Sequence, residues 1–88
     1  MTANTIHVTF KLYAALTDFL PLEADYQSVR LDVPSTTTVH NLVDRYAVPR
    51  RMMHLVLVNG IYIEPEDRDK PLLTDGDTVA IWPPVAGG

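Results

Sequence analysis

The spacing of apolar residues changes along this chain, and that change limits the possible folds more than any other feature. Residues 6–12, "IHVTFKL", and residues 26–33, "YQSVRLDV", alternate apolar and polar side chains. A period of two is typical of strands that bury one face. Residues 35–49 instead carry apolar side chains at the spacing of one helical stripe, namely Val39, Leu42, Val43 and Tyr46. The pattern predicts two strands followed by a short helix.

Two signals predict where this helix begins and ends. Thr37 or Thr38 can cap its start, because a threonine hydroxyl accepts a hydrogen bond from a free amide of the first turn. Pro49 disfavours helical backbone at Val48, so we expect the helix to end before that residue. Residues 13–25 connect the two strands loosely, and residues 17–22 could form one turn of helix.

Strand patterns return after the helix. Residues 54–60, "HLVLVNG", are apolar on both faces and end in an Asn-Gly turn signal. Residues 61–65 predict a short strand and residues 78–83 the last one, and the charged segment 66–77 between them is interpreted as a solvated turn. This order predicts an α+β fold, a mixed sheet of four to five strands with one main helix packed across one face.

Composition excludes several classes of function. The chain has 88 residues and no cysteine, which excludes disulfides, zinc ribbons and thiol catalysis. Its net charge of −4 is unfavourable for binding the phosphate backbone of nucleic acid. No apolar run approaches the ~20 residues that span a bilayer, and the N-terminus lacks the pattern of a secretion signal. We therefore expect a cytoplasmic protein with no nucleic-acid or membrane partner.

The interior of the sequence shows no catalytic or metal-binding pattern. The three histidines, His7, His40 and His54, lack the helical i, i+4 spacing of a metal motif. The four glycines are scattered and form no Gly-rich phosphate loop. We expect a protein that is not an enzyme by itself and that binds no metal or cofactor.

The end of the chain, "WPPVAGG", has the properties of a delivery arm. Pro83 and Pro84 cannot donate hydrogen bonds to a strand ladder, and their fixed φ favours an extended chain beyond them. Glycine permits close approach to the backbone of another protein. We expect residues 1–84 to form the folded domain, and residues 85–88 to form a flexible tail of Val85, Ala86, Gly87 and Gly88.

Together these features resemble the ubiquitin-like sulfur carriers, which include the small subunit of molybdopterin synthase and the thiamine-pathway sulfur carrier. The resemblance rests on the order of elements, on "LVLVNG" and "LLTDGDTVAIWPPVAGG", and on the final Gly-Gly. It implies a β-grasp (ubiquitin-like) fold. It also implies that an E1-like enzyme uses ATP to adenylate the carboxylate of Gly88, and that a sulfur donor system then displaces AMP to leave a thiocarboxylate.

The same resemblance implies further partners and leaves alternatives open. Molybdopterin synthesis is the first expectation, with Gly88 inserted into a large sulfurtransferase subunit; thiamine or another sulfur-containing metabolite is the alternative. A ubiquitin-like modifier would instead form isopeptide bonds through Gly88. A plain β-grasp binding module would need neither Gly87 nor Gly88.

The strand pattern also predicts a partner-docking face. The side chains predicted to face the helix are Val56, Val58, Val79 and Ile81. The side chains on the outer face are then Leu55, Leu57, Ala80 and Trp82. An apolar outer patch at the root of the tail indicates an association surface. A shift of one residue in register would exchange the two faces.

Overall fold

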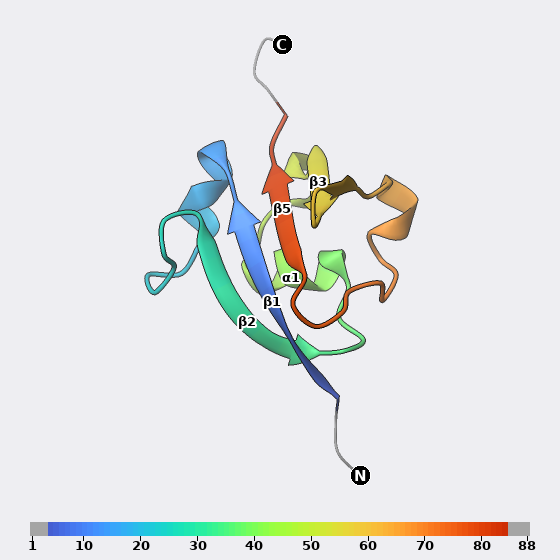
Figure 1. The fold of residues 1–88 in the computed structure, drawn as a ribbon. Coiled ribbons are helices and arrows are strands. Elements are labelled where there is room, and N and C mark those ends of the chain that lie inside the picture. Colours follow the sequence, from blue (N-terminus) through green and yellow to red (C-terminus); the bar gives the residue numbers. More distant parts are fainter. Residues whose placement is uncertain (1–3, 85–88) are drawn as a thin grey trace.

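The computed structural model describes residues 4–84 and shows a mixed five-stranded sheet with α1 behind it (Figure 1). The elements in chain order are β1 (Thr5–Leu12), η1 (Ala14–Phe19), β2 (Ser28–Pro34), α1 (Val39–Arg45), η2 (Arg50–Met52), β3 (Leu55–Val58), β4 (Ile61–Tyr62), η3 (Pro65–Asp67) and β5 (Thr78–Trp82), where η is a 3-10 helix. The strand order is β2-β1-β5-β3-β4, with β1 and β5 parallel and the other neighbours antiparallel. This arrangement confirms the α+β prediction.

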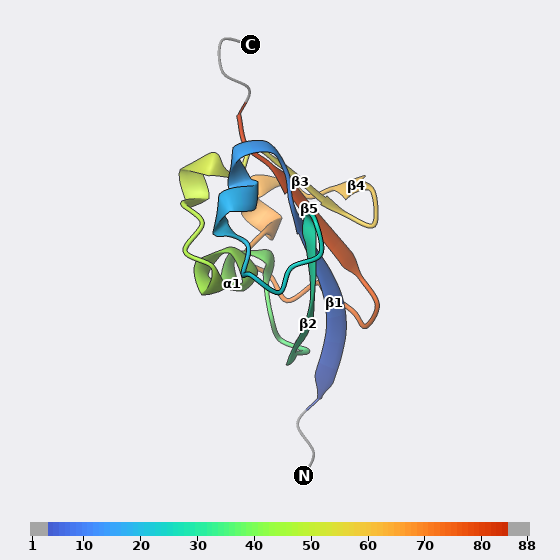
Figure 2. The same cartoon turned by 90° about the vertical axis from the view of Figure 1, so that its left-hand side faces the viewer.

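The core lies between the sheet and the helices, which all cover the same face (Figure 2). Alternate residues of β1 and β2 are buried, as the period of two predicts. Phe10 and Leu12 of β1 pack against the stripe of α1, whose buried residues are Val39, Leu42 and Val43. In residues 4–84, the outer face of the sheet carries no helix.

The start of α1 is fixed by a capping box around Thr38. The Asn41 amide donates to the Thr38 hydroxyl at 3.0 Å, and the Thr38 amide donates to the Asn41 side-chain oxygen at 2.9 Å. Of the two candidates, Thr37 and Thr38, it is therefore Thr38 that caps the helix. The helix ends at Arg45, and Ala47 adopts a φ of 60°, which directs the chain back so that the Val48 amide bonds to Val43.

Several boundaries differ from the prediction, and three of them change the local structure. The connection after β1 contains the 3-10 helix η1, which starts at Ala14 and buries Leu16 completely. β2 starts at Ser28 and not at Tyr26, because Tyr26 has a φ of 65° and leaves the extended region. β4 has only two residues, which pair beside the Asn59–Gly60 turn. The positive φ of both turn residues confirms the Asn-Gly signal.

The interpretation of residues 66–77 as a solvated turn was wrong in part. Arg68 is 5% exposed and Asp77 is 7% exposed. Arg68 donates to the carbonyl oxygens of Met53 and Ile63, both at 3.0 Å. The Asp77 carboxylate accepts bonds from the Asn59 amide and from Thr74. Burial of these charged groups is tolerated because their polar atoms are hydrogen-bonded, which composition does not reveal.

Candidate functional site

The pairing of β5 with its neighbouring strands ends directly before Pro83 and Pro84. Trp82, the last residue of β5, lies opposite Leu55 of β3. The His54 amide donates to the Trp82 carbonyl at 3.0 Å. Pro83 and Pro84 follow outside the strand, and Pro84 is exposed. Since neither proline has an amide hydrogen, the ladder cannot continue along them.

The predicted flexible tail, residues 85–88, lies outside the residues that the structure describes. Val85, Ala86, Gly87 and Gly88 are therefore considered below only through their covalent chemistry and the reach of the chain.

The register places the four predicted docking residues on the outer face, although they differ in accessibility. Their neighbours Val56, Val58, Val79 and Ile81 are buried against the helix side. Leu55, Leu57 and Trp82 are half-buried, whereas Ala80 is 8% exposed. Ala80 pairs with Lys11 on one side and with Leu57 on the other, so its short side chain lies between two longer ones. Ala80 therefore offers little surface to a partner.

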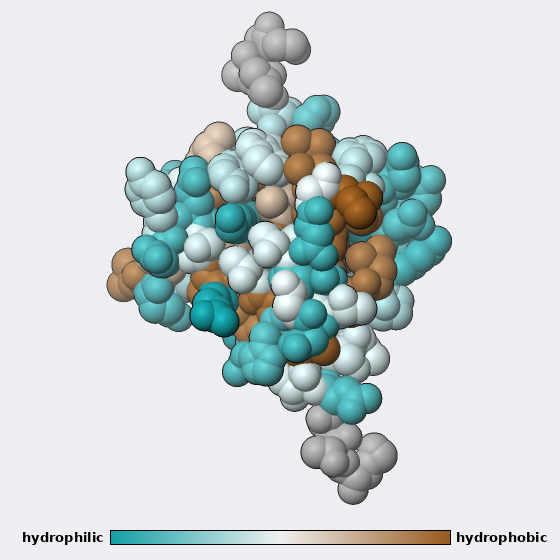
Figure 3. Space-filling model, viewed as in Figure 1, coloured by the Kyte–Doolittle hydropathy of each residue, from teal (hydrophilic) through white to brown (hydrophobic). Residues whose placement is uncertain are grey.

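A mostly apolar groove lies at the root of the tail. Its volume is about 420 Å³, and it is lined by Ala14, Ala15, His54, Leu55, Trp82, Pro83 and Pro84. We call this the tail-root groove. The Trp82 ring stacks on Tyr13, with ring centroids 4.2 Å apart and planes 2° from parallel. Pale and brown surface lies near the root of the tail at the upper end of the view, with hydrophilic residues beside and below it (Figure 3).

Sequence reasoning missed the contribution of Tyr13, Ala14 and Ala15. Ala14 and Ala15 line the groove, and Tyr13 stacks on its Trp82. All three follow β1 and lie here because β1 pairs in parallel with β5, which places Leu12 opposite Ile81. The aromatic Tyr13 directly after a strand was a signal, but the parallel pairing cannot be read from local periodicity. The tight bend at Ala14, with a φ of 54°, starts η1 beside the groove.

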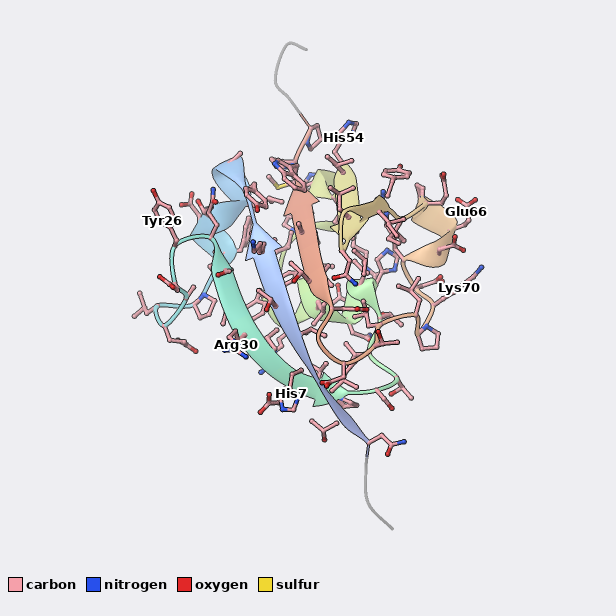
Figure 4. All side chains as sticks on the ribbon, in the orientation of Figure 1. His7, Tyr26, Arg30, His54, Glu66 and Lys70 are labelled. Atoms are coloured by element: carbon pink, nitrogen blue, oxygen red, sulfur yellow. The ribbon has the colours of Figure 1, made fainter. Side chains whose placement is uncertain are left out.

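Among residues 4–84, His54 is the only titratable side chain in the lining of the groove. His54 lies at the end of the sheet where β5 ends, and His7 lies near the opposite end (Figure 4).

Hydrogen bonds from the amide and ring of His7 lower the pKa of Asp75. A hydrogen bond from Arg50 lowers the pKa of Asp44, and partial burial lowers the pKa of His40.

Within residues 4–84, no group of three or more histidine and acidic side chains could hold a metal ion. No helix among these residues has the length and apolar character to cross a bilayer.

The comparison with protein families identifies the chain. The family described as Mut7-C ubiquitin matches residues 5–87, which include all five strands and α1. The chain belongs to the Mut7-C ubiquitin family. The ubiquitin-like assignment from the sequence is thereby confirmed. No curated protein sequence matches this family member significantly.

Solved structures similar to this Mut7-C ubiquitin protein share its fold. The HVO 2177 protein of Haloferax volcanii has a TM-score of 0.73 at 24% identity, over 96% of this chain and 88% of the other. Small archaeal modifier protein 1 of Methanosarcina acetivorans has a TM-score of 0.64 at 24% identity, over 97% and 99%.

A putative molybdopterin converting factor, subunit 1, from Pyrococcus furiosus has a TM-score of 0.61 at 21% identity, over 91% of this chain and 99% of the other. At these identities the similarities show the β-grasp fold.

Proposed function

We propose that this protein is a sulfur carrier whose C-terminal Gly88 is activated by an E1-like adenylating enzyme. An oxygen of the Gly88 carboxylate attacks the α-phosphorus of ATP, which releases pyrophosphate and leaves an acyl-adenylate. A sulfide ion from a donor system then attacks the carbonyl carbon, AMP leaves, and a thiocarboxylate remains. The protein is a cosubstrate in these steps and holds no cofactor, because the ATP is bound by the partner enzyme.

The observation that carries this proposal is the end of the β5 ladder at Trp82, followed by two prolines and a final Gly-Gly. The prolines stop strand pairing, and the glycines suit a narrow channel in which a side chain would collide. The chain contains no cysteine, so it cannot carry sulfur as a persulfide on its own side chains. The terminal carboxylate is the attachment point that this composition leaves.

Two structurally similar proteins support two uses of the same activation. The name of the Pyrococcus furiosus protein, a putative molybdopterin converting factor subunit, favours a role in molybdopterin synthesis. We propose that the sulfur would then be delivered in the active site of a large sulfurtransferase subunit. The name of the Methanosarcina acetivorans protein favours a modifier. In that use, a lysine amine of another protein would take the acyl group. We favour the carrier in molybdopterin synthesis, with thiamine or another sulfur-containing metabolite as the alternative destination. The use of ATP agrees with the cytoplasmic location expected from the sequence.

The test is to incubate the protein with the E1-like enzyme of its source organism and ATP. Pyrophosphate should be released, and after addition of sulfide the mass of the protein should rise by the difference between sulfur and oxygen. Removing Gly88, or adding one residue after it, should abolish both signals. Release that persists undiminished in either variant would show that Gly88 is not the reacting residue.

The modifier alternative is distinguished by the products in cells. Proteins digested with trypsin would then carry the C-terminal residues of this chain on lysine side chains, and the Gly88 deletion would remove them. A thiocarboxylate without such conjugates supports the carrier.

A further inference from the structure

The turn between β3 and β4 consists of Asn59 and Gly60, a dipeptide that is chemically prone to deamidation. In this reaction the Gly60 nitrogen attacks the side-chain carbonyl carbon (Cγ) of Asn59, and the side-chain amino group leaves with the Gly60 proton as ammonia. Water then opens the resulting succinimide ring to aspartate or isoaspartate. Glycine permits the attack because it has no Cβ to obstruct the approach. Both residues are exposed, on the side of the sheet away from α1 (Figure 2).

The side chain of Asn59 is held at both of its polar atoms by the start of β5. Its nitrogen Nδ2 donates to the Asp77 carboxylate at 2.8 Å, and its oxygen Oδ1 accepts from the Thr78 backbone amide at 2.9 Å. This orientation is the one that satisfies both contacts, because a carboxylate only accepts and a backbone amide hydrogen is only donated. We call these two bonds the Asn59 clamp. The backbone amide of Asn59 also donates to the Thr78 carbonyl at 2.9 Å. Movement of Cγ toward Gly60 therefore requires that the clamp breaks.

The backbone of the turn opposes the same attack. The φ angles are 52° at Asn59 and 82° at Gly60, which are typical of a two-residue type I′ hairpin turn. A positive φ places Asn59 in the left-handed region, where ψ is also positive. In that region the Gly60 nitrogen and the Cβ of Asn59 lie on opposite sides of the Cα–C bond. The five-membered ring cannot close until this bond rotates, and that rotation opens the hairpin turn.

From these two restraints we propose that Asn59 is a site of spontaneous modification that the folded protein keeps closed. Deamidation is slow while the clamp is formed and proceeds when the β3–β4 turn opens locally or the chain unfolds.

The product cannot form the clamp again. Aspartate at position 59 presents a carboxylate oxygen where Nδ2 donated to Asp77, which is 7% exposed. Two carboxylates this close repel each other, and there is little water around Asp77 to screen them. Isoaspartate adds a methylene group to the backbone of a two-residue turn and disturbs the pairing of β4 as well. Modification therefore records an opening of the turn irreversibly.

The experiment compares the rate of deamidation in the folded and the unfolded protein at the same neutral pH and temperature. Mass spectrometry of digested samples detects the replacement of the amino group by a hydroxyl, and isoaspartate is resolved by chromatography. In urea above the unfolding midpoint, Asn59 should be modified about tenfold faster or more than in the native protein, because the clamp and the turn are absent. Asn41, which precedes Leu42, is the internal control and should stay unmodified in both samples.

Among folded variants, Asp77→Ala removes one half of the clamp and should accelerate the modification of Asn59. Asp18→Ala removes an exposed carboxylate and should keep the native rate. Circular dichroism checks the fold of both variants, and the comparison in urea needs only the wild type.

The consequence of modification is tested with Asn59→Asp, which reproduces one product. This variant should melt at a lower temperature than the wild type at pH 7, and the difference should narrow as the pH falls toward about 4, where carboxylates begin to take up protons. Asn4→Asp adds the same charge at an exposed position and should melt like the wild type.

Equal rates for the folded and the unfolded chain would overturn the protective role of the clamp. Absence of modification in urea would show that Asn59 is not a reactive site. A wild-type melting temperature for Asn59→Asp at pH 7 would show that the fold accepts the product and that opening leaves no lasting effect. None of these measurements depends on the carrier function.

Discussion

At the scale of single residues, the buried guanidinium of Arg68 connects parts of the chain that are distant in sequence. Besides its bonds to Met53 and Ile63, it donates to the Tyr62 hydroxyl at 3.3 Å. The Arg68 carbonyl accepts from the amide of His40 in α1 at 3.0 Å. Among the described residues no acidic side chain forms an ion pair with it. Neutral oxygen atoms therefore satisfy this cation, and they hold the segment after η3 against the start of β3.

We expect Arg68→Ala to lower the free energy of unfolding by about 2–4 kcal/mol, because buried carbonyl oxygens lose their donors. Urea unfolding followed by circular dichroism measures the change. Arg51→Ala is the matched control, since Arg51 is exposed, and it should unfold at the wild-type urea concentration. Equal midpoints for Arg68→Ala and the wild type would show that these bonds contribute nothing to stability.

The hydrogen bonds to the Asp75 carboxylate predict that the stability of the fold depends on pH. The His7 amide donates to its carboxylate at 2.7 Å, and a ring nitrogen of His7 lies 2.9 Å from the same oxygen. These bonds lower the pKa of Asp75 in the folded state below its ordinary value of 3.8. The stabilisation by these bonds is therefore complete when the pH is above the pKa of Asp75 in the unfolded state. It is lost as the pH falls through the lower pKa of Asp75 in the folded state.

We expect Asp75→Asn to be less stable than the wild type at neutral pH and to show a shallower loss of stability as the pH falls below about 4. Urea midpoints measured across this range give the comparison. Asp18→Asn changes an exposed carboxylate and should keep the wild-type slope. An unchanged slope in Asp75→Asn would assign the acid sensitivity to other carboxylates.

At the scale of elements, α1 depends on its first turn. A helix of seven residues has few internal hydrogen bonds, so the two bonds of the capping box form a large share of its support. The stripe of α1 faces the core, and loosening of the first turn would therefore also expose Val39 and Leu42.

We expect Thr38→Ala to lower the free energy of unfolding by about 0.5–2 kcal/mol, since it removes the acceptor for the Asn41 amide. Thr38→Ser keeps a hydroxyl and should recover most of the loss. Thr36→Ala, two residues earlier at an exposed position, serves as the control in the same thermal and urea measurements. If alanine at position 38 were tolerated without loss, the capping box would be dispensable.

At the scale of the whole molecule, the described core is complete before the tail. The central pairs β1–β5 and β3–β5 end at Ile81 and Trp82, and the buried residues of the core lie between positions 6 and 81. The fold and the proposed chemistry therefore occupy different parts of the chain.

We expect removal of residues 85–88 to leave the melting temperature unchanged while pyrophosphate release with the E1-like enzyme is lost. Differential scanning calorimetry and the adenylation assay measure the two properties on the same protein. A marked fall in melting temperature would mean that these residues pack on the domain, and the tail would then be part of the fold.

Although the apolar residues on both faces of β3 and β5 left open which face is buried, the sequence by itself determined the number and types of the main elements and the point where the last ladder must stop. These properties follow from local periodicity and from the missing amide hydrogen of proline, which act over a few residues. Only the tertiary structure decided that β1 lies parallel to β5, because pairing between distant strands leaves no local pattern. That pairing brings Tyr13, Ala14 and Ala15 to the root of the tail. The burial of Arg68 was likewise visible only in the tertiary structure, because the carbonyl oxygens that accept its hydrogen bonds are not encoded by side-chain identity.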